Sequence, residues 1–199
     1  MVERHIPKYY PSQEIPDLPR QCTLRDGHDV AMTYLKTTGV HHIHALAAEA
    51  AQHDLNVGRD EFESVADLEY LLNHSEAFTF HRHNVLVGVL ILQPSWYSTS
   101  WRKHTCDIRI IPSMWLYERG GVAMLLEIGQ ELVLQLGLLY DAAAVCVFLG
   151  AKGVYQQVRD AGFTPTAVLP NIGYTSRGKH KPQKAALLYK QLTSPAKVS

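Results

Sequence analysis

A loop with two adjacent glycines leads directly into a strongly amphipathic helix, and this junction constrains the fold more than any other feature of the sequence. The loop reads Tyr117-Glu118-Arg119-Gly120-Gly121. In the helix that follows, apolar residues recur at steps of three and four, the period of one buried face: Val122, Leu125, Leu126, Gly129, Leu132, Val133 and Leu136. Such a helix needs a second layer of structure to cover that face.

The same junction predicts an anion site. Glycine permits positive φ angles and has no side chain to keep a ligand away from the backbone amides. The first turn of a helix leaves about four N–H groups without intrahelical acceptors, and the helix dipole adds roughly half a positive charge there. A phosphate or pyrophosphate would fit this position.

Helical and strand patterns follow one another along the rest of the chain. The predicted helices besides the one after the glycine loop are Asp29–Lys36, Val40–Gln52, a segment from Asp60 to Asn73, and Gly153–Ala161. The predicted strands are Cys22–Arg25, Ala77–His81, Val85–Leu92, His104–Ile111, Tyr140–Leu149, Phe163–Leu169 and Ala185–Leu192. This order indicates a mixed α/β fold, in which a ligand is expected outside the carboxyl ends of the strands.

The composition is typical of a soluble single domain. We expect residues 22–199 to form that domain, because 46% hydrophobic residues suffice for a core, and residues 1–21 to form an extended proline-containing arm. The formal net charge is zero, so the whole protein exerts no electrostatic attraction on nucleic acid or an anionic membrane. No run of about 18 apolar residues predicts a membrane span.

The cysteines predict a reducing compartment. Cys22, Cys106 and Cys146 are odd in number and far apart, and no CxxC spacing occurs, so neither a disulfide framework nor a zinc knuckle is expected. We therefore expect reduced thiols in a cytoplasmic protein.

The order of elements resembles the GNAT superfamily of acyl-CoA-dependent N-acyltransferases from about Cys22 to Leu192. The family's loop pattern is Gln/Arg-x-x-Gly-x-Gly/Ala. Gly121 and Ala123 match its last two positions, whereas Glu118 stands where Gln or Arg is expected. The dipeptide Gly162-Phe163 after the later helix and the Leu-Leu-Tyr-Lys segment of the last strand add to the resemblance. The sequence contains neither a Rossmann GxGxxG motif nor a P-loop.

The resemblance implies a fold, a reaction and a cofactor. The expected fold is a mostly antiparallel, twisted central sheet that splays at the cofactor site and is flanked by helices. The expected enzyme transfers an acetyl group from acetyl-CoA, or the acyl group of another acyl-CoA, to a primary amine by direct attack. The implied contacts to the cofactor pyrophosphate are Glu118, Arg119, Gly120, Gly121, Val122 and Ala123, and the implied contacts to the pantetheine and acyl groups are Ile110, Ile111 and Ser113.

Three residues are candidates for proton transfer. The family usually has a tyrosine about five residues before Gly-Phe that protonates the CoA thiolate, and counting back from Gly162-Phe163 this position is Val158. Tyr155 lies on the same helix face, three residues earlier, and is the predicted replacement. His104 and Asp107 are the candidate bases on the strand before the loop. Strict alternation places only one of them toward the site, and Asp107 could instead pair with Arg109.

By the same resemblance, the amine acceptor would contact the start of the second helix, the loop after the hairpin and the last hairpin. The predicted acceptor residues are His41, His44, Trp96, Trp101 and Tyr174. The acceptor would be a small molecule or a protein amine. Histidine pairs such as His41 and His44 can bind zinc, but we expect no metal site because no accompanying cysteine pair or HExxH spacing is present.

Two alternative functions remain open. An enzyme that modifies a nucleobase amine in DNA or RNA would be consistent with the aromatic loop around Trp96 and with the basic segment 176–184. A non-catalytic CoA-binding domain would be consistent with Val158 at the expected proton-donor position. The proline-containing arm could form a homodimer contact or lack order.

Overall fold

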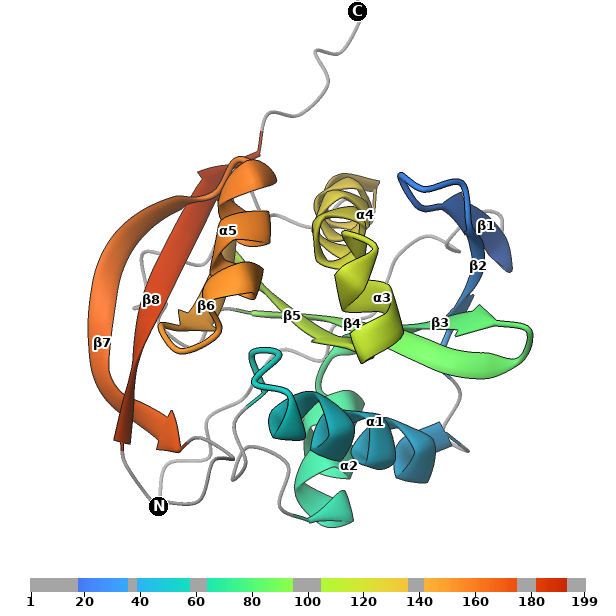
Figure 1. Cartoon of the computed structure of the whole chain (residues 1–199), viewed down its shortest axis with the longest axis horizontal. Helices are drawn as coiled ribbons and strands as arrows, with labels where there is room; N and C mark the ends of the chain where they lie inside the picture. The colour runs from blue at the N-terminus through green and yellow to red at the C-terminus, as the bar shows by residue number, and fades with distance from the viewer. Residues whose placement is uncertain are drawn as a thin grey trace, which may run out of the picture.

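One eight-stranded sheet runs through the molecule (Figure 1). The computed structural model describes residues 18–35, 39–57, 64–94, 105–135, 142–174 and 182–192. The strands are β1 (Arg20–Thr23), β2 (Asp29–Tyr34), β3 (Glu76–Arg82), β4 (Val85–Pro94), β5 (Thr105–Pro112), β6 (Ala142–Phe148), β7 (Thr164–Tyr174) and β8 (Pro182–Gln191), in the spatial order β1-β2-β3-β4-β5-β6-β8-β7. Neighbouring strands are antiparallel except β5 and β6, which are parallel.

Helices cover both faces of the sheet (Figure 1). Helices α1 (Val40–Gln52) and α2 (Val65–Asn73) lie on one face, and α3 (Met114–Glu118), α4 (Gly121–Gln135) and α5 (Lys152–Asp160) lie on the other. Each face has its own cluster of buried apolar residues. Within the described ranges, none of these helices combines the length and apolarity that crossing a membrane would require.

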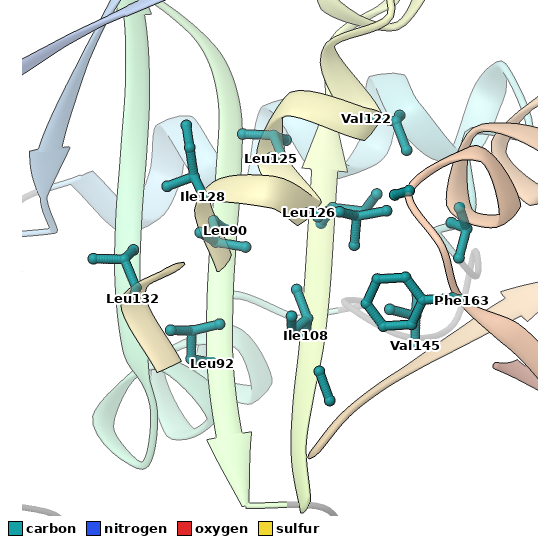
Figure 2. Close-up of a cluster of buried hydrophobic side chains, with 14 of the residues drawn as sticks. Leu90, Leu92, Ile108, Val122, Leu125, Leu126, Ile128, Leu132, Val145 and Phe163 are labelled. Carbon is teal, nitrogen blue, oxygen red and sulfur yellow. The ribbon is translucent and has the colours of Figure 1, made fainter. Parts of the chain in front are cut away.

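The amphipathic face of α4 forms the centre of one core. Leu125, Leu126 and Leu132 are at most 1% exposed and lie over β4 and β5, near Leu90 and Ile108 (Figure 2). Burying a leucine side chain contributes about 1.5 to 3 kcal/mol. This row of side chains therefore fixes α4, and with it the glycine loop, against the sheet.

Most of the predicted elements are confirmed, but the predicted helix Asp29–Lys36 is wrong. These residues form strand β2, between β1 and β3. Val30 and Met32 are each 1% exposed while their neighbours Ala31 and Thr33 are half-buried, so burial alternates with the period of a strand. The short helix α3, which was not predicted, follows β5 and includes the first two residues of the glycine loop, Tyr117 and Glu118.

Two other predictions concern the amino-terminal part and the cysteines. Strand β1 begins at Arg20, so the predicted domain boundary at Cys22 falls inside a strand, while residues 1–17 of the predicted arm lie outside the described residues. Cys22, Cys106 and Cys146 form no disulfide with one another.

Strands β5 and β6 pair only at their beginnings. The register runs from Thr105 opposite Ala142 to Asp107 opposite Ala144 and ends there. Beyond this point, residues 108–112 of β5 do not pair with residues 145–148 of β6. We call this region the split. Because the strands are parallel, the split lies at their carboxyl ends, where α3, the glycine loop and α5 follow. The splayed sheet predicted from the family resemblance is thus present.

Candidate active site

The glycine loop presents backbone amides beside the split. Gly120 has a φ of +71°, and a Cβ atom at this position would meet no atom within 4 Å. The amide of Ala123 donates to the Gly120 carbonyl at 3.1 Å, whereas the first-turn amides of Gly121 and Val122 have no acceptor inside the helix. The open space is at Gly120, whereas Gly121 and Val122 are buried. A left-handed glycine at a helix N-terminus is a position where a pyrophosphate would bind.

Gly121 lacks a side chain because α3 occupies the place where it would lie. A Cβ atom at Gly121 would overlap Leu116 and would lie 2.7 Å from the Leu116 carbonyl oxygen. Helix α3 is itself held by Ser113, whose hydroxyl accepts a hydrogen bond from the Leu116 amide at 3.2 Å. The short helix therefore fixes the backbone position of the loop.

The predicted cofactor contacts with charged side chains lie at the rim of the loop. Glu118 is exposed. Arg119 forms an ion pair with Asp26, in which Nε lies 3.3 Å from Oδ2 without hydrogen-bond geometry. Its Nη1 atom donates a hydrogen bond to the Trp115 carbonyl at 3.1 Å. Arg119 and Arg82 also lie against the Trp115 ring, at 4.7 and 4.5 Å from its centroid. Phosphate binding at this loop would therefore depend mainly on the backbone amides.

The predicted contacts on β5 divide between the two faces of the sheet. Ile110 belongs to the core under α4, and Ile111 to the core under α1. Ser113 follows Pro112 at the end of the strand, where its amide donates to the Val87 carbonyl at 2.8 Å. These three residues are buried and border the split.

A side chain from the other face pairs with the free edge of β6. The Nδ2 atom of Asn56 donates to the Cys146 carbonyl at 3.0 Å, and its Oδ1 accepts from the Phe148 amide at 2.7 Å. A carbonyl at position i and an amide at i+2 are the pair that a neighbouring strand would use. The carboxamide of Asn56 thus takes the place of a backbone peptide group, and the edge of β6 in the split is occupied.

The candidate acid and base residues lie on both sides of the split. Asp107 is 6% exposed and is the last residue of β5 that pairs with β6. Tyr155 is half-buried on α5 and packs against the α4 core, whereas Val158 is fully buried in that core. His104 lies outside the described residues. The roles of these residues remain predictions.

The other face carries a pocket of about 820 Å³ between α1 and strands β2 to β4. One face of α1 lines it through His42, Leu46 and Glu49. The Oε1 atom of Glu49 lies 3.5 Å from the Met114 amide, at the upper limit of a hydrogen bond, so this carboxylate connects the pocket to the end of β5. The other lining residues that the structure describes are Leu18, Pro19, Thr33, Tyr34, Leu35, Gly39, Ile43, Ala45, Thr79, His81, Asn84, Val85 and Leu86.

A tyrosine of the pocket wall, Tyr34, pairs with a buried carboxylate that is not among the described lining residues. The Tyr34 hydroxyl donates to Glu76 Oε2 at 2.7 Å, and Glu76 is 7% exposed. Burial and the adjacent Glu76 carboxylate raise the pKa of the Tyr34 hydroxyl, so it stays protonated and keeps this bond at neutral pH. Glu49 is thus the exposed carboxylate of the pocket wall.

Only part of the predicted acceptor set can be placed. His41 is exposed and His44 half-buried on α1, and the pocket wall contains their neighbour His42 instead. Trp96 and Trp101 lie outside the described residues, and Tyr174 ends β7. In the described ranges, no three His, Cys, Asp or Glu side chains gather as a metal site.

Sequence reasoning did not find Glu49 or Asn56. Glu49 contacts the first residue of α3, 65 residues later in the chain, and Asn56 contacts strand β6, 90 and 92 residues later. Periodicity reports which face of an element is buried, but it does not report which distant strand that face meets.

Comparisons with known proteins agree with this geometry at the level of the fold. No protein-family model matches the sequence, and no curated protein matches it. Solved structures do match. An acetyltransferase of the GNAT family from Streptococcus pneumoniae has a TM-score of 0.65 at 12% identity, over 82% of this chain and 99% of that one.

Two further structures contain the cofactor. A Salmonella typhimurium protein assigned as an acetyltransferase, with acetyl-CoA bound, has a TM-score of 0.67 at 14% identity, covering 85% of this chain and 98% of its own. The spermidine N-acetyltransferase from Vibrio cholerae, in complex with CoA and spermine, has a TM-score of 0.63 at 15% identity, covering 83% and 96%. The likeness spans more than four-fifths of the chain, and this chain has the fold of the GNAT acetyltransferases.

Proposed function

We propose that this protein is an N-acyltransferase that transfers an acyl group, acetyl in the simplest case, from acyl-CoA to a primary amine. The observation that carries the proposal is the placement of the glycine loop and α4 N-terminus beside the split in the sheet. An anion anchored on the loop amides would place an attached group at the carboxyl ends of β5 and β6. The GNAT fold of structures that contain CoA or acetyl-CoA supports the same cofactor.

The chemistry divides between the cofactor and the chain. Bound acyl-CoA supplies an activated acyl group as a thioester. The chain must bind the amine, remove a proton from it and provide a proton for the departing thiolate. Tyr155 remains the predicted proton source for the thiolate, and Asp107 remains a predicted base.

The α1 pocket is the proposed acceptor site. Its described lining residues include no lysine or arginine, and apolar side chains such as Ile43, Leu46 and Leu86 form much of its wall. Glu49 stands where the pocket meets the end of β5, so it could both hold a protonated amine and accept its proton. This chemistry favours an amine with a single charge and an apolar body.

A transfer assay tests the proposal. Acetyl-CoA and a panel of primary amines, from apolar monoamines to spermidine, are incubated with the protein, and acetylated products are quantified by mass spectrometry. We expect transfer to apolar monoamines and a loss of about 100-fold in kcat/KM in Glu49→Gln, within the usual range for a general base. Glu127→Gln, which removes an exposed carboxylate on α4, is the matched control. If no amine in the panel is acetylated, the proposed acyltransferase activity is wrong. If Glu49→Gln keeps full activity, Glu49 is not the base and Asp107 remains the candidate.

A non-catalytic CoA-binding domain is the alternative that a specific observation favours. Val158, at the position where the family resemblance places a proton donor, is fully buried and cannot donate a proton. Tyr155→Phe separates the two functions, because an enzyme that uses Tyr155 loses turnover but keeps CoA binding. Trp96, Trp101 and most of the basic segment 176–184 lie outside the described residues, and only residues 182–184 of that segment are described, at the start of β8. The nucleic-acid alternative therefore stays a prediction.

A further inference from the structure

Tyr117 is placed between the two cores of the protein. It is the half-buried fourth residue of α3. Among the described residues, it alone packs as a partly buried side chain against both apolar clusters. The sheet separates these clusters, so a side chain that contacts both lies where the sheet is not continuous. The split at the carboxyl ends of β5 and β6 is that place.

The ring of Tyr117 rests against the first turn of α5. A Cβ atom at Gly153 would overlap the Tyr117 hydroxyl and would lie 3.0 Å from Cζ of the ring. The Nε2 atom of Gln157, one turn further along α5, lies 3.4 Å from the Tyr117 carbonyl. Glycine at position 153 therefore leaves the space that the hydroxyl occupies, and Tyr117 spans from the end of β5 to the helix that follows β6.

This position lies between the two parts of the proposed cofactor site. The side chain of Tyr117 packs against both cores at the split, and the chain continues from Tyr117 directly into the loop amides of Gly121 and Val122. A ligand that is anchored by its pyrophosphate at the loop and carries its reactive group on an extended arm must pass Tyr117 to reach the split.

We infer that Tyr117 controls the entry of the cofactor's pantetheine arm, and that its ring must leave the site against Gly153 before the arm can enter the split. This inference rests on the proposed function. If the ring occupies its site about nine-tenths of the time, the apparent affinity for the arm falls about tenfold, because only the remaining fraction of molecules is competent to bind. Tyr117 then selects against ligands whose arm interactions do not compensate for this cost.

Two ligands separate the arm from its anchor. CoA carries the arm, whereas 3′-phosphoadenosine 5′-diphosphate has the same nucleotide and pyrophosphate without it. Stopped-flow binding of both, followed by intrinsic tryptophan fluorescence, is measured for the wild type, Tyr117→Ala and Tyr117→Phe. We expect Tyr117→Ala to raise the association rate of CoA about tenfold and to leave that of the armless nucleotide unchanged. Tyr117→Phe keeps the ring and should bind CoA as the wild type does.

Gly153→Ala provides a second test that keeps the tyrosine, in case Tyr117→Ala does not fold. The new methyl group and the Tyr117 hydroxyl cannot share one site, so the ring is displaced from α5. We expect CoA association to accelerate in this variant as well, with the armless nucleotide again unaffected.

The possible results separate an error about Tyr117 from an error about the proposed cofactor site. If both ligands bind the wild type but neither Tyr117→Ala nor Gly153→Ala changes the CoA rate, or if they slow it, Tyr117 does not control entry and the cofactor site stands. If neither ligand binds the wild type, the proposed cofactor site itself is wrong, and this inference is wrong with it.

Discussion

At the scale of single residues, Gly120 and Gly121 are adjacent but are glycines for different reasons. Gly120 adopts a left-handed φ of +71° in open surroundings, so the constraint there is conformational. At Gly121 the space for a side chain is filled by Leu116, so the constraint there is steric. The contact between Gly121 and Leu116 also sets the position of the first-turn amides of α4.

Alanine at each position should separate these two roles. Gly120→Ala should cost roughly 1 to 2 kcal/mol of stability from the left-handed backbone. Gly121→Ala should cost about 1 to 3 kcal/mol from overpacking against Leu116, and the backbone must shift to relieve it. We therefore expect the affinity for acetyl-CoA to fall at least tenfold in Gly121→Ala, and less in Gly120→Ala.

Urea unfolding gives the two stabilities, and isothermal titration calorimetry gives the two affinities. Wild-type affinity in Gly121→Ala would show that the amides at the start of α4 are not the anchor.

At the level of strands and helices, the edge of β6 in the split is paired with the side chain of Asn56 and not with a neighbouring strand. Asn56 adopts a left-handed φ of +67° after α1 and turns its carboxamide onto the edge of β6. This contact ties α1, and the pocket that it lines, to the sheet on the far side of the split. It also leaves β5 as the strand whose edge a ligand can approach.

Asn56→Gly should release this edge. Glycine tolerates the left-handed backbone, so the change removes only the carboxamide. Leaving the Cys146 carbonyl and the Phe148 amide unpaired should cost about 1 to 3 kcal/mol. Hydrogen exchange at the Phe148 amide, measured by NMR, should accelerate at least tenfold.

Asn84→Gly is the matched control for that experiment. Asn84 has a similar φ of +65° in the exposed β3–β4 turn, and its side chain makes no hydrogen bond within the described part of the chain. An unchanged exchange rate at Phe148 in Asn56→Gly would mean that the carboxamide does not protect the edge of β6.

The same elements show which features of the fold a sequence can predict. The hairpin of β3 and β4 and the helix α4 follow from period and turn residues, because each is determined by contacts near in sequence. Strand β2 was mistaken for a helix because Asp29–Tyr34 is short and its alternation spans only two fully buried residues, Val30 and Met32. Helix α3 is a single turn, too short for a periodic pattern to be detected.

At the scale of the whole molecule, the sheet separates two proposed binding regions. Helices α3, α4 and α5 form the cofactor side, and α1 forms the acceptor side with the pocket. The two sides meet where β5 and β6 part. The amides of the proposed cofactor side could be predicted as a site because they lie within one continuous segment. The walls of the pocket come from four separate segments, and no local pattern in the sequence describes them.

Thermal unfolding with and without acetyl-CoA shows whether the glycine loop and the split bind the cofactor. A ligand present at 100 times its dissociation constant adds about 2.7 kcal/mol to the stability of the folded protein. For a chain of 199 residues this corresponds to a rise in Tm of about 5 to 10 °C. We expect this rise with acetyl-CoA and a much smaller one with ATP at the same concentration. An unchanged Tm at millimolar acetyl-CoA would contradict the assignment of the glycine loop and the split as a cofactor site.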